Sequence, residues 1–176
     1  GAGYNGWRHN DNPFIIKPKK DGIFNMSQIE YQHKGGHYFA GAALHTRHYP
    51  IDDEGEMAAS NDATNNTTCA WWIYGEQNLW TAGDKSIAAM LQYSENTSRS
   101  NGCYRFAEVG GAYKDSKNEC GVSAQYAQFH QGIERTLELT WKRQITESIA
   151  LQPYFQYINN KNGDFTVLSA RLYYSF

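Results

Sequence analysis

The chain has 176 residues, 40% of them apolar, which is enough for one compact domain rather than two. Its formal net charge of −2 comes from interspersed acids and bases without a basic run, which argues against nucleic-acid binding. No stretch approaches the roughly 20 consecutive apolar residues of a membrane-spanning helix, and the aromatic content of 15% favours strands.

Runs of about ten residues with alternating polarity follow one another along the chain, which is the pattern of a transmembrane β-barrel. In chain order, we expect strands near 1–8, 23–33, 36–48, 68–80, 85–95, 103–113, 120–130, 133–142, 149–157 and 168–176. The last run alternates most strictly: Leu172 and Tyr174 share one face, and Arg171 and Tyr173 share the other. The predicted fold class is therefore all-β, an antiparallel transmembrane β-barrel with about ten strands in this chain.

The predicted connections fall into two classes. Tight ones lie at 81–84, 114–119 and 146–148, and longer polar ones lie at 8–22 and 50–67. Outer-membrane barrels have short periplasmic turns and long outer loops. If the last strand runs inward to end at Phe176, these tight connections all fall on the periplasmic side.

Several segments resemble the carbohydrate-selective porins, often called the OprB family. They are ERTLELTWK (134–142), LQPYFQYI (151–158) and ARLYYSF (170–176), together with WIYGEQNLW (72–80) and, more loosely, YFAGAALH (38–45). The resemblance runs from about residue 36 to the end, and LQPYFQYI is its most discriminating segment, because many outer-membrane barrels end in an aromatic residue.

The resemblance implies a location in the cell outer membrane and passive diffusion of mono- or disaccharides and ions, with no enzymatic activity. Family barrels have sixteen strands, so we expect residues 1–176 to be the C-terminal half of a single barrel domain. The remaining strands then come from an N-terminal part that is missing or on a separate chain, and Gly1 does not resemble a mature start. Porins often form homotrimers, and no residue here bears on that point.

A sugar channel needs polar groups that exchange hydrogen bonds with hydroxyls, and aromatic faces against which pyranose rings can slide. Pairing the last three strands places Lys142, Gln152 and Arg171 at similar height, with Glu138 and Gln156 about one sheet step above. The candidate substrate-contacting residues of the lumen wall are Glu134, Glu138, Lys142, Gln152, Gln156, Arg171, Trp72 and Glu76. Any water-filled lumen needs polar side chains, so this cluster is better supported than its single members.

Alternation also places Trp72, Tyr74, Glu76, Asn78 and Trp80 on one face, which we interpret as the lumen. Trp80 lies near a turn, so an interfacial anchor is an equal alternative for it.

The sequence favours neither a metal nor a cofactor. The acids at 52–56 lack the alternating ligands and the glycine of a calcium loop. His45 and His48 point to opposite faces of a strand, which prevents shared ligation. The pattern Gly1-x-Gly3-x-x-Gly6 has no strand before it and no helix after it, as a dinucleotide site requires.

The three cysteines are too few and too scattered for a disulfide scaffold. Strand direction places Cys69 and Cys103 at the outer ends of their strands and Cys120 near a periplasmic turn. We expect Cys120 to pair with neither of them, and a bridge between the other two requires their loops to bend together.

Two alternatives from other classes remain open. A small, complete ten-stranded barrel with surface enzymatic activity would use the acids at 51–56 beside His45 and His48. A secreted β-sandwich lectin is suggested by the aromatics and by the acceptor triplets at 66–68 and 96–98. Detergent dependence separates the lectin from either barrel.

Overall fold

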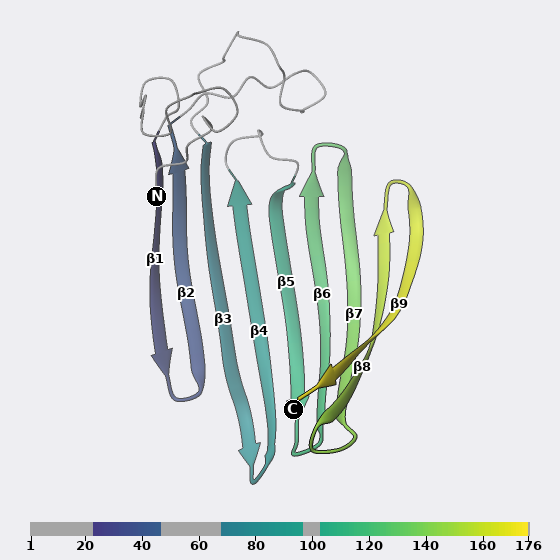
Figure 1. Cartoon of the computed structure of the whole chain (residues 1–176). Helices are drawn as coiled ribbons and strands as arrows, with labels where there is room; N and C mark the ends of the chain where they lie inside the picture. The colour runs from purple at the N-terminus through teal and green to yellow at the C-terminus, as the bar shows by residue number, and fades with distance from the viewer. Residues whose placement is uncertain (1–22, 47–67, 97–102, 176) are drawn as a thin grey trace, which may run out of the picture.

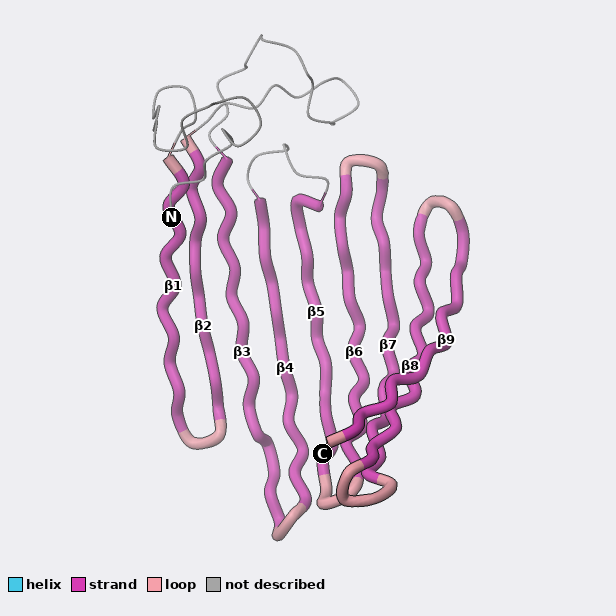
Figure 2. Tube along the Cα trace, in the orientation of Figure 1, coloured by secondary structure: helices cyan, strands magenta, loops and turns pink. Residues whose placement is uncertain are grey.

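The structure is a computed structural model that describes residues 23–46, 68–96 and 103–175. Nine strands cover most of these residues: β1 (Phe24–His33), β2 (Gly36–His45), β3 (Thr68–Ala82), β4 (Lys85–Asn96), β5 (Cys103–Lys114), β6 (Asn118–Phe129), β7 (Gly132–Gln144), β8 (Ile149–Asn160) and β9 (Gly163–Tyr174). Each strand pairs antiparallel with the next one along the chain, so the sheet order is β1 to β9 (Figures 1 and 2). The prediction of an all-β, antiparallel fold is confirmed for the described residues.

The observed strands match nine of the predicted ones, with shifted ends. β9 begins at Gly163, five residues before the predicted start, because a two-residue hairpin at Lys161 and Asn162 returns the chain at once along β8. β2 is described to its end at His45. The predicted strand at 1–8, the long loops at 8–22 and 50–67, and Phe176 lie outside the described residues.

The tight connections gather at one end of the sheet, which we call the turn end. It carries the β1–β2, β3–β4, β5–β6 and β7–β8 connections, at the bottom of Figure 1. In the first of these, Lys34 and Gly35 both have positive φ, 41° and 77°, as a two-residue hairpin of the primed type requires. At the opposite end β6–β7 and β8–β9 are also joined by two residues each, so loop length distinguishes the two ends less than the sequence suggested.

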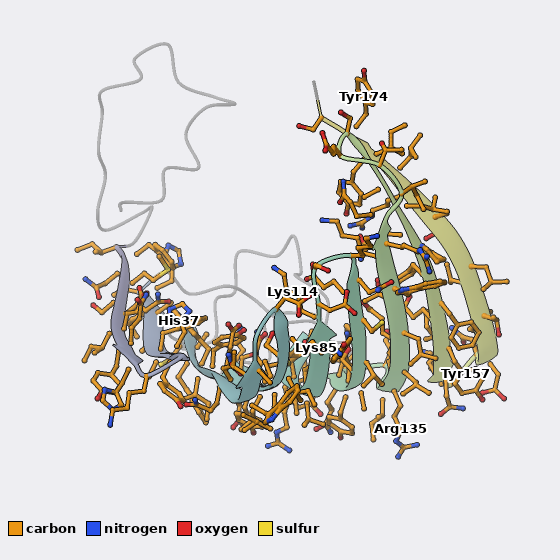
Figure 3. The ribbon with its side chains drawn as sticks, turned by 90° about the horizontal axis from the view of Figure 1, so that it is seen from below. His37, Lys85, Lys114, Arg135, Tyr157 and Tyr174 are labelled. Atoms are coloured by element: carbon orange, nitrogen blue, oxygen red, sulfur yellow. The ribbon has the colours of Figure 1, made fainter. Side chains whose placement is uncertain are left out.

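The sheet is a single curved layer. Seen along the strands, it forms an arc with His37 and Lys114 on the concave side and Arg135 and Tyr157 on the convex side (Figure 3). Among the described residues, Ala150 is the only buried hydrophobic residue, at 3% exposure. The chain therefore builds no core there, and what shields the apolar side chains has to come from outside these strands.

The two faces of the arc differ sharply in polarity. The convex face carries an apolar row on every strand from β3 to β9, with members such as Ile73, Leu91, Val109, Val122, Leu139, Leu151, Leu168 and Leu172, all of them exposed. The concave face carries most of the acids, amides and hydroxyls of the strand interiors. This division follows from the period of two in each strand.

A β-bulge in β3 corrects one sequence-based interpretation. Asn78 pairs with Ala88 but Trp80 pairs with Ile87, so Leu79 is an extra residue in the ladder. The bulge moves Trp80 to the convex face, away from Trp72. The prediction that Trp80 shares a face with Trp72 is therefore wrong.

Candidate functional site

The concave face brings all eight candidate wall residues to one side of the sheet. Glu138 pairs with Gln156, and Gln152 pairs with Arg171. On the N-terminal side, Glu76 lies next to His37 of β2. Alternation within each strand places the others with them: Trp72 on β3, and Glu134 and Lys142 on β7.

One row of the ladder joins the two halves of this face. It runs from Glu76 through Met90, Gly110 and Ser123 to Glu138, by successive cross-strand pairs. Glu76 and Glu138 are thus four strands apart at the same height, or about 19 Å at the usual strand spacing. A hollow of about 440 Å³ lies over the small residues between them.

Four carboxylates line this hollow, those of Glu76, Glu108, Glu119 and Glu138, and three of them accept a hydrogen bond from a side chain on the same or a neighbouring strand. The hydroxyl of Tyr74 donates to Glu76 Oε2 at 2.6 Å, and Gln125 Nε2 donates to Glu108 Oε1 at 3.1 Å. Tyr154 donates a longer bond, 3.4 Å, to Glu138 Oε2. A carboxylate offers about four acceptor positions, so these contacts orient the three groups without saturating them.

Glu108 is one member of this site that sequence reasoning missed, and Lys114 and Glu119 are two others. The strand of Glu108 was predicted, but its face was not assigned. The signal was available in the β5–β6 hairpin, because counting outward from the Asp115–Lys117 turn pairs Glu108 with Gln125.

A second cluster lies toward the turn end of β7, β8 and β9. Gln152 Nε2 donates to Thr140 Oγ1 at 2.6 Å, and the hydroxyl of Tyr173 donates to Gln152 Oε1 at 2.6 Å. Lys142 Nζ lies 4.6 Å from the centre of the Tyr173 ring, a cation–π contact. Arg171 is the cross-strand partner of Gln152 and completes the cluster.

The relative heights differ from the sequence-based estimate. Glu138 lies four residues from Lys142 on β7, and Gln156 lies four residues from Gln152 on β8. Same-face residues recur every second position, so the separation is two steps, or about 13 Å, rather than one. Glu134 is a further four residues away, where its Oε2 accepts a 3.1 Å bond from Asn160 Nδ2.

Aromatic residues form two belts on the convex face. The belt nearer the turn end contains Trp80, Tyr113 and Trp141, which lie in one cross-strand row through Ile87 and Cys120. The belt nearer the opposite end contains Trp71, Tyr93 and Tyr126, and Trp71 packs against Tyr93 at 5.1 Å between ring centres. The two rows are six positions apart on β4, from Ile87 to Tyr93, or about 20 Å along the strand.

The polar tips of these belts point toward the two ends of the sheet. At the turn end, Tyr113 donates to Asp115 Oδ2 and Trp141 Nε1 donates to Asn118 Oδ1, both at 3.2 Å. At the opposite end, Tyr93 donates to Glu95 Oε2 at 3.2 Å, and Tyr126 donates a 3.5 Å bond to Gln128 Oε1. The rings therefore lie toward the middle of the convex face and their polar groups toward its margins.

The cysteines follow the expected placement. No disulfide joins Cys69, Cys103 and Cys120. Cys120 lies in the belt row at the turn end, whereas Cys69 and Cys103 lie at the opposite end with β4 between their strands. The bridge left open between the last two is absent from the structure.

The described residues contain no group of three or more His, Cys, Asp or Glu that could hold a metal ion. His37 and His45 occupy the same face of β2, while His48 and the acids at 51–56 lie outside the described residues.

No family model, curated protein or solved structure matches this chain. No helix in the described segments is long and apolar enough to cross a membrane. Any inference about function therefore rests on the chemistry of the two faces of the sheet.

Proposed function

We propose that this chain forms part of the wall of an outer-membrane β-barrel channel, through which mono- or disaccharides diffuse passively. The observation that carries the proposal is the curved single layer, polar on its concave face and apolar on its convex face, with no core among the described residues. A barrel in a membrane satisfies both faces: lipid covers the convex side and water fills the concave side.

The convex face supports lipid contact through its two aromatic belts. They lie about 20 Å apart along the strands, or about 15 Å along the membrane normal for strands tilted by about 40°, and apolar side chains fill the band between them. Tyr and Trp gather at membrane interfaces because their rings are apolar and their tips are polar, and here the tips are aimed outward. The ion pair between Glu95 and Arg105, 2.9 Å, lies in the row of Trp71, at the outer edge of the belt at the opposite end.

The edges of the sheet support completion by further strands. Among the described strands, β1 and β9 are the two edges, and each leaves a row of backbone groups to be paired. The resemblance to the sixteen-stranded carbohydrate-selective porins supports the view that these partners belong to an N-terminal part or to a second chain. Closure of that larger barrel gives a water-filled lumen.

The concave face has the chemistry of a permeation wall. Its acceptors and donors lie at three successive heights: Glu108, then the row of Glu76 and Glu138, then Lys142 and Arg171. A channel must bind its solute strongly enough to favour its arrival and weakly enough to release it, which several exchangeable hydrogen bonds achieve better than one deep pocket. Passage by diffusion breaks no covalent bond and needs no cofactor.

The proposal is tested by removing one donor or one acceptor of the wall. In proteoliposomes containing the complete channel, we expect Glu138→Ala and Arg171→Ala each to change the ratio of sugar to ion flux, because each removes one contact without closing the pore. Arg135→Ala is the matched control for Arg171→Ala, because it also removes a positive charge but from the convex side. Heat-modifiable gel mobility checks folding. Unchanged sugar flux in both variants would refute the assignment of these residues to the channel wall. A wild-type channel that passes no sugar would refute the proposed function.

A further inference from the structure

The indole of Trp72 lies over Gly41, its cross-strand neighbour on β2. A Cβ atom on Gly41 would lie 2.5 Å from Cε2 and 2.8 Å from Nε1 of the indole, and closer still to Cζ2. The ring thus occupies the space that any other side chain would fill. Only glycine permits this approach.

The edge of the same ring is held by a third strand. Gln28 of β1 is the cross-strand neighbour of Gly41, and its Oε1 accepts a 3.1 Å hydrogen bond from Trp72 Nε1. Gln28, Gly41 and Trp72 therefore form one row across β1, β2 and β3. With one face against Gly41 and its N–H bound to Gln28, the half-buried indole turns its other face away from the sheet, toward the concave side.

We propose that this outward face is a stacking platform for a pyranose sugar, an inference that rests on the proposed function and assigns one subsite within it. A glucopyranose ring with equatorial hydroxyls presents C–H groups on both faces and its hydroxyls around the rim. The apolar face packs on the indole, and the rim hydroxyls reach the polar groups beside it. Tyr74 and its partner Glu76 follow on the same face of β3, and Ser94 is the neighbour on β4.

The fixed orientation of the ring matters for recognition. A tryptophan that rotates freely loses side-chain entropy when a sugar stacks on it, whereas this indole is already held at its underside and its edge. A purely structural role, in which the ring only covers the bare backbone of Gly41, is the alternative. That role predicts effects on folding and none on sugar binding.

Two variants separate these roles by moving the ring or removing it. Gly41→Ala keeps the indole but forces it off the sheet, and Trp72→Ala deletes it. We expect each to weaken glucose affinity by about three- to tenfold, the range of one aromatic contact. The double variant should be no weaker than Trp72→Ala alone, because both changes act on the same ring. The measurement is the concentration of glucose that halves block of ion current through the complete channel.

Two controls and one substitute variant make the test specific. Gly75→Ala adds a methyl group 3.1 Å from Tyr38 Cδ1 on the convex face and should leave glucose affinity unchanged. Mannitol, a linear polyol without a ring, should show no difference between wild type and variants. If Gly41→Ala does not assemble, Gln28→Ala releases the indole edge instead and should give a smaller loss in the same direction.

The outcomes distinguish this inference from the function on which it rests. If Trp72→Ala and the ring-displacing variant leave glucose affinity unchanged while Glu138→Ala and Arg171→Ala alter sugar flux, the platform is wrong and the channel wall stands. An equal loss of mannitol and glucose binding also overturns the platform. If the wild-type channel neither binds nor passes glucose, both fall together.

Discussion

At the scale of single residues, Asp115 organises the turn between β5 and β6. Its Oδ1 accepts hydrogen bonds from the backbone N–H groups of Lys117 and Asn118, at 2.8 and 2.7 Å. The bond from Lys117 is the largest of the contacts that hold the pKa of Asp115 below its usual value. The pKa of Asp84 in the neighbouring turn is lowered likewise by its contacts with the side chain and backbone of Ser116.

These lowered pKa values predict a loss of stability in acid. A carboxylate whose pKa is lower in the folded state stabilises that state fully above the ordinary pKa, near 4, and the contribution disappears as pH falls through the lowered value. We expect the thermal midpoint of gel-mobility conversion to fall below about pH 4. In Asp115→Asn, which keeps an acceptor oxygen but no titrating group, this decline should be smaller. A decline as steep as in wild type would contradict the assignment to Asp115.

Residue faces were predictable wherever the alternation of a strand is unbroken. Arg171, Gln152 and Glu138 share one face of the sheet, as the alternation predicts, because their strands contain no extra residue. Trp80 was not, because no pattern in the sequence marks Leu79 as the residue that the ladder skips. The position of Trp72 over Gly41 could not be predicted from the sequence either, because it depends on the register that pairs the two residues.

At the scale of the strand, β9 predicts an alternating pattern of access to water. Ser169 pairs with Tyr154 on the concave face, and Ala170 pairs with Pro153 on the convex face. In a cysteine-free background of the complete channel, Ser169→Cys should react with a charged thiol reagent several times faster than Ala170→Cys. Comparable rates at both positions would show that the two faces do not differ in access to water.

The strands also fix the distance between two cysteines. Cys69 on β3 and Cys103 on β5 are separated by β4, about 10 Å at the usual strand spacing, whereas a disulfide needs Cα atoms within about 7 Å. We therefore expect a non-reducing peptide map to contain no Cys69–Cys103 cross-link. Finding that cross-link would mean that the strand ends bend together.

Strand existence was more predictable than strand ends. Turn residues such as Ala82-Gly83-Asp84 and Lys34-Gly35 mark where the chain reverses, and Gly83 and Gly35 have the positive φ that such reversals use. The early start of β9 was missed because Gly163 and Asp164 have low strand propensity, and pairing with β8 overrides it. The short β6–β7 connection was already implied by the predicted strands at 120–130 and 133–142, although His130 and Gln131 are not typical turn-forming residues.

For the molecule as a whole, the proposed function depends on what covers each face of the arc. Exposed apolar side chains run across the convex face, and the described strands supply no second layer. The second sheet that a β-sandwich lectin needs is not among these nine strands. The proposed function therefore requires lipid on the convex face and water on the concave face.

Quenching of tryptophan fluorescence by brominated lipids tests that requirement most directly, because the quencher acts only on rings that contact the acyl region. Two versions of the complete channel would each keep one of the tryptophans of this chain, either Trp141 in the convex belt or Trp72 on the concave face, with every other tryptophan replaced by Phe. We predict strong quenching of Trp141 and little quenching of Trp72 in brominated bilayers. Equal quenching of both, or quenching of Trp72 alone, would contradict the assignment of the faces, and quenching of neither would contradict insertion into the membrane.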